Sequence, residues 1–192
     1  MSQANFKRQI MSAFRGSWNG NLNTLSFADA MYSSIRRGFN QAWNEGSSFC
    51  SIAENERTQA ETDKLNLLIG DNFQYVSALA DWLFEHSKAK GVKFADVVYR
   101  ADLWINRYTE VVGIAKTMAC SDSKYRWQID GGEHCRSCLK LNGRVARGSA
   151  WSSRGIAPRS TSGILRCGGF NCKCSFIPTD QKVTRGRWPN LP

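Results

Sequence analysis

Five of the seven cysteines in this chain lie within forty residues, between Cys135 and Cys174. Residues 121–192 contain little apolar sequence, so this part of the chain needs a cross-link in order to fold. Clustered thiols in a chain without an export signal indicate metal ligation in a reducing compartment rather than a disulfide scaffold. We therefore expect a small metal-bound module in the C-terminal part of the chain.

The spacing of the cysteines fits a structural zinc site. Cys135-x-x-Cys138 can grip an ion from a single turn, and a second group of cysteines follows after 28 residues. Structural zinc sites are usually closed tetrahedra with four ligands, so five thiols are one too many. Our first choice of ligands is Cys135, Cys138, Cys172 and Cys174. Cys167 either replaces one of the last pair or lies just outside the site.

Glycines close to the cysteines support turns of the zinc-knuckle type. Gly143 follows Cys138 by five residues, and Gly168 and Gly169 follow Cys167 directly. Glycine lets backbone N–H groups turn toward the sulfurs. Zinc binding contributes about 10–16 kcal/mol at neutral pH, so folding of this module is expected to depend on metal.

Other interpretations of the cysteines stay open. The clustered thiols could be free or disulfide-paired, and His134, next to Cys135, is an alternative ligand although its side chain would normally point away. Cys50 and Cys120 each lie within or at the end of a predicted helical segment. We expect both to be buried structural thiols.

The first 120 residues have the periodicity of amphipathic helices. Helices are predicted over residues 3–18, from Ser26 as N-cap to Gly46, over a long or kinked segment between Ala53 and Leu83, and from Phe94 onward. The last helix has apolar residues at alternating steps of three and four, for which we expect packing roles: Phe94, Val97, Ala101, Trp104, Tyr108, Val111 and Ala115.

From Lys124 onward the helical period disappears, and all four prolines lie between Pro158 and Pro192. Short strands and turns should dominate here. We therefore predict a mainly α fold: a helical N-terminal body over 1–120, a small cysteine-rich, zinc-bound module of short strands and knuckle turns over 121–180, and a basic, proline-containing tail over 181–192.

The positive charge is concentrated in the C-terminal part. Residues 1–120 contain 13 Lys or Arg against 12 Asp or Glu, whereas residues 121–192 contain 13 against 4. Such a surplus is typical of a surface that faces nucleic acid or an acidic protein, although a solvated basic face explains it equally well. The candidate phosphate-binding residues are Arg136, Lys140, Arg144, Arg147, Arg154 and Arg159.

Neither an export signal nor a membrane span is predicted. Charged and polar residues interrupt the first eighteen positions, and the longest apolar stretch, Val76 to Phe84, contains Asp81. That stretch is far shorter than the roughly 20 residues that cross a bilayer. We expect a soluble intracellular protein.

A catalytic site is not predicted. His86 and His134 are the only histidines, too few for a histidine-rich metal-dependent nuclease, and no serine lies in a nucleophile-elbow sequence. Asp130 and Glu133 fit turn positions better than an acid–base pair. An all-thiolate zinc site would also have no open position for water.

Residues 70–180 resemble a known family. The segments YRWQIDGGEHCRSCLKLNGRV and LRCGGFNCKCSFIPT, with Trp151, Gly155 and Pro158 between them, are similar to the C-terminal motif of the Mu F-like phage minor head proteins, also called head-morphogenesis proteins. Many members have a histidine three residues before the final Cys-x-Cys. This chain has Phe170 near that position and Cys167 close by.

This resemblance implies zinc at Cys135, Cys138, Cys167, Cys172 and Cys174, without catalysis. It also implies association with the portal and the major capsid protein, a place in the virion or procapsid interior, host cytoplasm during assembly, and contact with double-stranded DNA in some members. The alternatives are a free-standing zinc-dependent nucleic-acid-binding protein and, more weakly, a zinc-finger nuclease.

Overall fold

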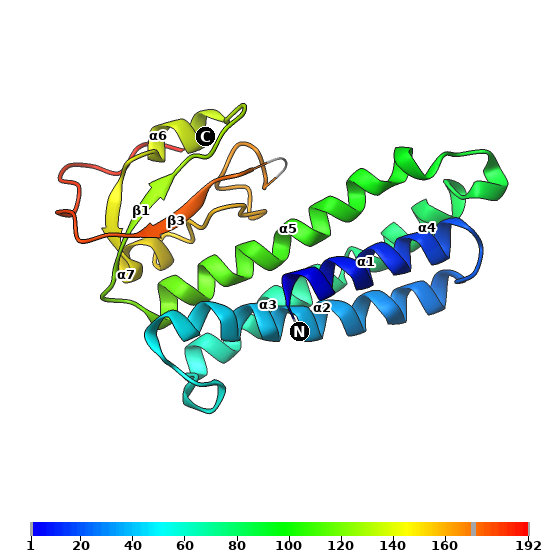
Figure 1. The fold of residues 1–192 in the computed structure, drawn as a ribbon, viewed down its shortest axis with the longest axis horizontal. Coiled ribbons are helices and arrows are strands. Elements are labelled where there is room, and N and C mark those ends of the chain that lie inside the picture. Colours follow the sequence, from blue (N-terminus) through cyan, green and yellow to red (C-terminus); the bar gives the residue numbers. More distant parts are fainter. Residues whose placement is uncertain (1, 170–171, 192) are drawn as a thin grey trace. The chain divides into compact units, whose positions relative to one another are not determined.

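The computed structural model describes residues 2–169 and 172–191 and shows a mainly helical N-terminal body and a small C-terminal sheet (Figure 1). The predicted fold class is confirmed. The chain forms two compact units, which do not follow the predicted boundary at residue 120. Unit 1 comprises Met1–Ala42 and Thr62–Tyr108, and unit 2 comprises Trp43–Glu61 and Thr109–Pro192.

Five long or medium helices precede the sheet: α1 (Gln3–Trp18), α2 (Thr24–Ser47), α3 (Gln59–Phe73), α4 (Val76–Glu85) and α5 (Phe94–Ala119). Short 3-10 turns lie between some of them: η1 (Ser48–Cys50), η2 (Glu54–Glu56) and η3 (Lys88–Lys90). None of the helices in the described residues is long and apolar enough to cross a membrane.

Two details of the helix predictions are wrong. The expected N-cap at Ser26 lies inside the first turn of α2, where its backbone N–H donates to the Asn23 side chain at 2.8 Å. Asn23 therefore caps this helix. The expected third helix is two helices, because the chain turns at Gln74 and Tyr75 between α3 and α4.

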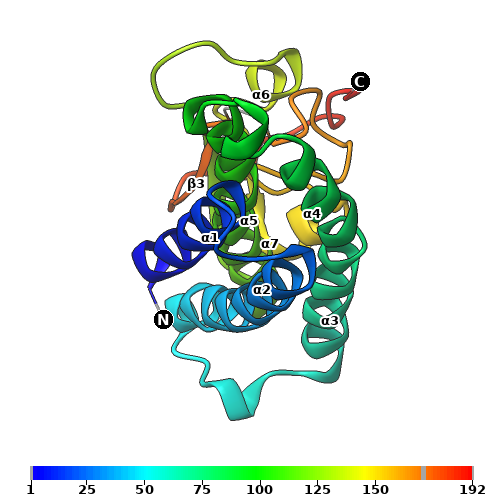
Figure 2. The same cartoon turned by 90° about the vertical axis from the view of Figure 1, so that its right-hand side faces the viewer.

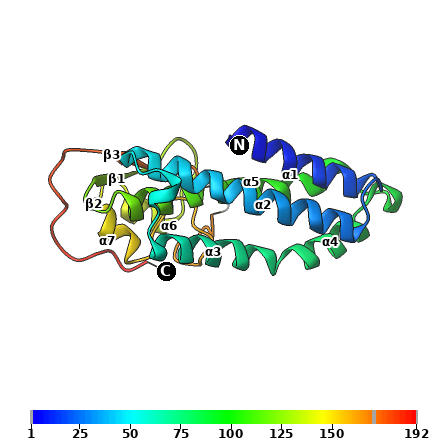
Figure 3. The ribbon, with the colours of Figure 1, turned by 90° about the horizontal axis from the view of Figure 1, so that it is seen from below.

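Unit 1 contains α1, α4, most of α2 and α3, and the first part of α5, and these helices lie side by side (Figures 2 and 3). Phe6 on α1 contacts Tyr108 on α5, with ring centroids 5.5 Å apart. The apolar positions spaced by three and four residues face one another, as their period predicts. Residues of unit 1 that are fully buried include Phe6, Ile10, Phe14, Phe27, Met31, Ile35, Phe39, Val76, Leu83 and Val97.

Unit 2 contains one antiparallel sheet with the strand order β2-β1-β3. Its strands are β1 (Lys124–Gln128), β2 (Val145–Arg147) and β3 (Ser175–Pro178). Tyr125 pairs with Ala146 on one side and with Pro178 on the other. Two short helices, α6 (Arg136–Leu141) and α7 (Gly148–Ser152), belong to the same unit.

The core of this sheet is aromatic. Burial alternates along β1, so that Tyr125 and Trp127 are buried. Trp127 contacts Phe176 of β3 edge to face at a centroid distance of 5.6 Å, and Trp151 of α7 lies 5.0 Å from the same ring. The Trp151 indole N–H donates to the Tyr125 carbonyl. Large rings thus supply core volume in a segment that has few aliphatic side chains.

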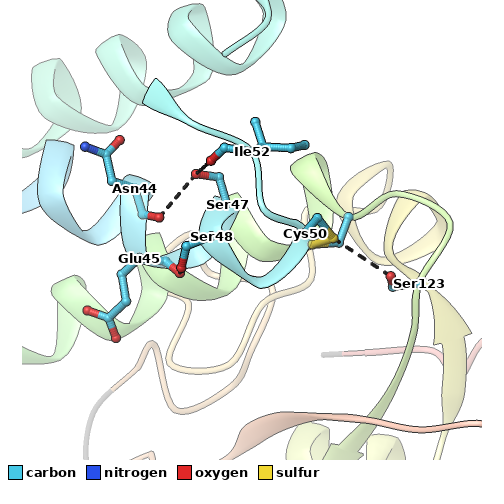
Figure 4. Close-up of a disulfide and its surroundings, with 8 residues drawn as sticks. Asn44, Glu45, Ser47, Ser48, Cys50, Ile52 and Ser123 are labelled. Atoms are coloured by element: carbon cyan, nitrogen blue, oxygen red, sulfur yellow. Dashed lines mark hydrogen bonds between the residues drawn. A yellow bond between two sulfur atoms is a disulfide. The ribbon is translucent and has the colours of Figure 1, made fainter. Parts of the chain in front are cut away.

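The two cysteines outside the cluster form a disulfide within unit 2. Cys50 at the end of η1 is bonded to Cys120, just after α5, across a sequence separation of 70 residues (Figure 4). The Cys50 sulfur also lies 4.0 Å from the Ser123 hydroxyl. The prediction that both are buried structural thiols is therefore wrong in two respects: the two cysteines are bonded to each other, and Cys50 is half-buried although Cys120 is buried.

Candidate metal centre

All five clustered cysteines come together in unit 2. Cys135 caps the N-terminus of α6, and Cys138 lies in its first turn. Cys167 lies in a turn between α7 and β3, and Cys172 and Cys174 directly precede β3. The backbone thus brings a helix start, a turn and a strand entry to the same place. This arrangement agrees with the two-segment site expected from the spacing.

The sulfurs form two groups that share one member. In one group are Cys135, Cys138 and Cys167, and in the other are Cys138, Cys172 and Cys174; within each group all sulfurs lie within 4.8 Å of one another. The Cys135 and Cys138 sulfurs are 3.4 Å apart, and those of Cys138 and Cys172 are 4.0 Å apart. The cluster can therefore hold a metal ion.

The two groups differ in burial. Cys138, Cys172 and Cys174 are all buried, whereas Cys135 and Cys167 are half-buried. We call the first trio the inner triangle, and Cys135, Cys138 and Cys167 the outer triangle. The first-choice ligand set combined Cys135 with the inner triangle. Among the described residues no single group of four sulfurs forms, so the structure does not gather that set into one compact site.

The thiols of the cluster differ in pKa. Hydrogen bonds from Cys138 and then Cys174 lower the pKa of Cys172 to about 2, and the contact with Cys172 raises the pKa of Cys138. Burial raises the pKa of Cys135, but hydrogen bonds from Cys138 and Cys167 outweigh it and lower that pKa to about 7. Burial raises the pKa of Cys167 to about 11. A metal ion can replace the protons on such thiols.

A serine that the sequence analysis did not single out ties the two cysteine segments together. Ser137, between Cys135 and Cys138, is fully buried, and its hydroxyl accepts a hydrogen bond from the Arg166 backbone N–H at 2.9 Å. Arg166 precedes Cys167. This bond holds the turn of Cys167 against α6, and no spacing rule in the sequence would have found it.

The outer triangle borders a cavity. Its volume is about 520 Å³. Besides the outer triangle, its lining includes the loop from Gly131 to His134 and Cys172. His134 is half-buried and does not belong to either sulfur group. Asp130 accepts a hydrogen bond from the Ser175 hydroxyl at 3.3 Å.

The predicted phosphate-binding residues lie at the surface of unit 2, but several contact the tail. The centre of the Trp188 ring lies 4.2 Å from the guanidinium carbon of Arg144 and 4.5 Å from that of Arg154. The Lys140 ammonium donates to the Asn190 carbonyl. Burial, and then the charge of Arg154, lowers the pKa of Arg144.

The remaining candidates differ in their surroundings. Arg147 is exposed and pairs with Asp122 at 3.5 Å. Arg136 is exposed on α6, and Arg159 is half-buried in the loop after α7, with a positive φ of 62°. The six residues therefore do not form one uninterrupted row of free cations. Tail residues that the sequence analysis had treated as a separate basic segment occupy part of this surface.

No protein-family model matches this chain, and searches among curated proteins and solved structures also find no similar protein. The resemblance to the phage minor head proteins therefore rests on the motif residues themselves and stays a prediction.

Proposed function

We propose that this chain is a structural assembly protein of the phage minor head type, with a helical body that docks on portal or capsid protein. In this proposal zinc fastens the C-terminal module, which presents a rigid basic surface toward packaged DNA. The observation that carries the proposal is the convergence of the Cys135-x-x-Cys138 turn with Cys167, Cys172 and Cys174. That convergence matches the motif order on which the family resemblance rests.

Zinc is the metal that this donor set favours. The candidate ligands are all thiolates, and soft sulfur ligands at tetrahedral spacing select zinc or iron–sulfur clusters over magnesium or calcium. Hydrogen bonds from backbone N–H groups to the sulfurs, such as that from Cys138 to Cys135 at 3.5 Å, suit a structural zinc knuckle.

A structural role fits the composition of the module. The strands have three to five residues each, and a small core of this kind gains little stability from burial alone. A metal that joins α6 to the entry of β3 would supply the missing free energy. The chemistry proposed for the ion is therefore to hold segments together, and no reaction is assigned to it.

Contact with double-stranded DNA is part of the same proposal. The surplus of positive charge in residues 121–192 supports it, with Arg136 and Arg147 as exposed cations. A free-standing DNA-binding protein would bind duplex DNA by itself, with an affinity that falls steeply with salt.

Co-expression with portal and capsid proteins tests the proposal. The full chain should sediment with assembled heads on a gradient, and Cys138→Ser should lose most of this association because both sulfur groups include Cys138. His134→Ala serves as the control, since His134 lies beside the cluster but outside both groups. Its incorporation should equal that of the wild-type chain.

Two results would contradict the proposal. One is a wild-type chain that stays at the top of the gradient while heads assemble. The other is divalent-metal-dependent DNA cleavage that the His134→Ala variant loses, because it would assign the cluster to a nuclease.

A further inference from the structure

The cluster has five thiols, one more than a single tetrahedral ion can use. In a tetrahedral zinc–thiolate site with Zn–S bonds of about 2.3 Å, the sulfurs lie about 3.8 Å apart. The observed separations of 3.4 Å for Cys135–Cys138 and 4.0 Å for Cys138–Cys172 are close to this value. The Cys138 sulfur therefore lies at a metal-ligand distance from a sulfur of each triangle.

The pattern of sulfur groups does not favour a single ion. Among the described residues the sulfurs gather as two triangles with Cys138 in common, and not as one group of four. A single four-thiolate ion would require Cys135 or Cys167 to move toward Cys172 and Cys174, and it would leave the fifth thiol unused. Two ions use every thiol where it lies.

We propose that the module binds two metal ions, one in each triangle, with the Cys138 thiolate as the bridge between them. This inference deepens the metal-binding part of the proposed function and rests on that part alone. The thiol protons leave to solvent as the ions bind. Five thiolates and two divalent ions have a net charge of −1, so most of the buried thiolate charge is compensated.

The two positions differ in access to solvent. The three cysteines of the inner triangle are all buried, at α6 and at the entry of β3, so an ion there acts as the structural fastening. All three cysteines of the outer triangle line the cavity of about 520 Å³, and two of them, Cys135 and Cys167, are half-buried; of the inner triangle, Cys138 and Cys172 line it but Cys174 does not. The outer ion therefore completes its coordination with a ligand from solvent and exchanges first.

Native mass spectrometry of the full-length chain, titrated with zinc or cadmium, counts the ions directly. The wild-type chain should take up two. Cys167→Ser and Cys174→Ser should each retain one, because each removes a ligand from only one triangle. Cys138→Ser should bind fewer ions than either. Arg166→Ala, an exposed neighbour of Cys167 whose backbone bond to Ser137 is unchanged, is the control and should still bind two.

Cadmium-113 NMR of the loaded wild-type chain adds a measurement that does not depend on variants. Two resonances of equal intensity are expected, and a brief exposure to a chelator should remove one of them first. Circular dichroism of each serine variant shows whether its helices are intact. If a variant fails to fold, the two resonances of the wild-type protein still decide the question.

Saturation of the wild-type chain at one ion, with a thiol of the cluster still open to alkylation, would overturn the two-ion inference and leave the assembly proposal standing. No bound ion at all would overturn both. Two bound ions in a chain that never enters heads would overturn only the assembly proposal.

Discussion

Glu110 on α5 accepts two hydrogen bonds from Thr161, one from the backbone N–H at 3.0 Å and one from the hydroxyl at 3.1 Å. Glu110 is buried, and Thr161 lies in the loop that leads to Cys167. Both residues belong to unit 2. The carboxylate therefore fixes the loop from α7 to the metal cluster at a point where the sequence offers no regular secondary structure.

Glu110→Gln should destabilise the chain by about 1–3 kcal/mol, because the neutral amide offers one acceptor oxygen in place of the two charged carboxylate oxygens that the Thr161 N–H and hydroxyl use. Urea denaturation followed by circular dichroism measures the change. Glu85→Gln removes only an exposed ion pair with Lys90 and should cost under about 1 kcal/mol. Equal effects for the two variants would show that the Glu110–Thr161 contact does not stabilise the loop.

Removal of the disulfide should lower the stability of unit 2. A cross-link between Cys50 and Cys120, separated by 70 residues, restricts the unfolded chain, and the Cys50→Ser/Cys120→Ser double variant should lose about 2–4 kcal/mol. Thermal denaturation measures the loss. Alkylation under native, non-reducing conditions should leave these two cysteines unmodified in the wild-type protein. Their ready alkylation would show that the bond does not form.

Gly169→Ala should destabilise the chain more than Gly163→Ala does. Gly169 has a φ of 78°, and an added Cβ would collide with the Arg159 carbonyl oxygen. Gly163 also has a φ of 78°, but nothing lies within 4 Å of an added Cβ. Gly163→Ala should therefore cost about 1 kcal/mol from backbone strain, and Gly169→Ala about 1–3 kcal/mol more from the collision.

The zinc affinity of the two glycine variants can be measured by competition with a chromogenic chelator. Zinc affinity should fall in Gly169→Ala and stay close to wild type in Gly163→Ala. A similar affinity in both variants would mean that the loop can shift without disturbing Cys167 or Cys172.

Trp188→Ala should release the C-terminal tail. The Trp188 ring packs edge to face on Trp151 at 4.8 Å and lies beside the guanidinium groups of Arg144 and Arg154. Loss of these contacts should cost about 1–3 kcal/mol. Limited digestion with trypsin should then cut at Arg185 and Arg187 several times faster. The exposed Val183→Ala is the control, and equal cutting rates would show that Trp188 does not hold the tail.

The burial of Lys116 should make the stability of the chain depend on pH. Burial lowers the pKa of its ammonium group, which lies 3.7 Å from the centre of the Phe49 ring. Because the folded-state pKa is below the unfolded value of 10.5, the unfolded chain binds more protons between the two values, and stability rises with pH in that window. Below the window the penalty of the buried charge is fully present.

Lys116→Met keeps the apolar stem and removes the charge, so the stability of this variant should lack this rise. The difference in unfolding free energy between variant and wild type should therefore shift in favour of wild type as the pH increases from 8 toward 10.5. Guanidinium denaturation at several pH values measures this difference. A constant difference would contradict a lowered pKa at Lys116.

Much of the helical body could be predicted from the sequence. The helix over residues 3–18 is present with those limits, and the apolar steps from Phe94 onward form α5. Such patterns are reliable because the 3.6-residue period places the apolar face within a few neighbouring turns. The break at Gln74 and Tyr75 was harder to place, since no proline or glycine marks it.

The gathering of five cysteines was also determined by the sequence. Cys135 and Cys138 share one turn because two residues separate them, and Cys172 and Cys174 share one strand entry for a similar local reason. Only the tertiary structure decided that Cys138 belongs to both sulfur groups, that Cys50 pairs with Cys120, and that Trp188 covers Arg144. These contacts join residues far apart in the chain. They depend on loop closure and sheet register, which no local period or spacing encodes.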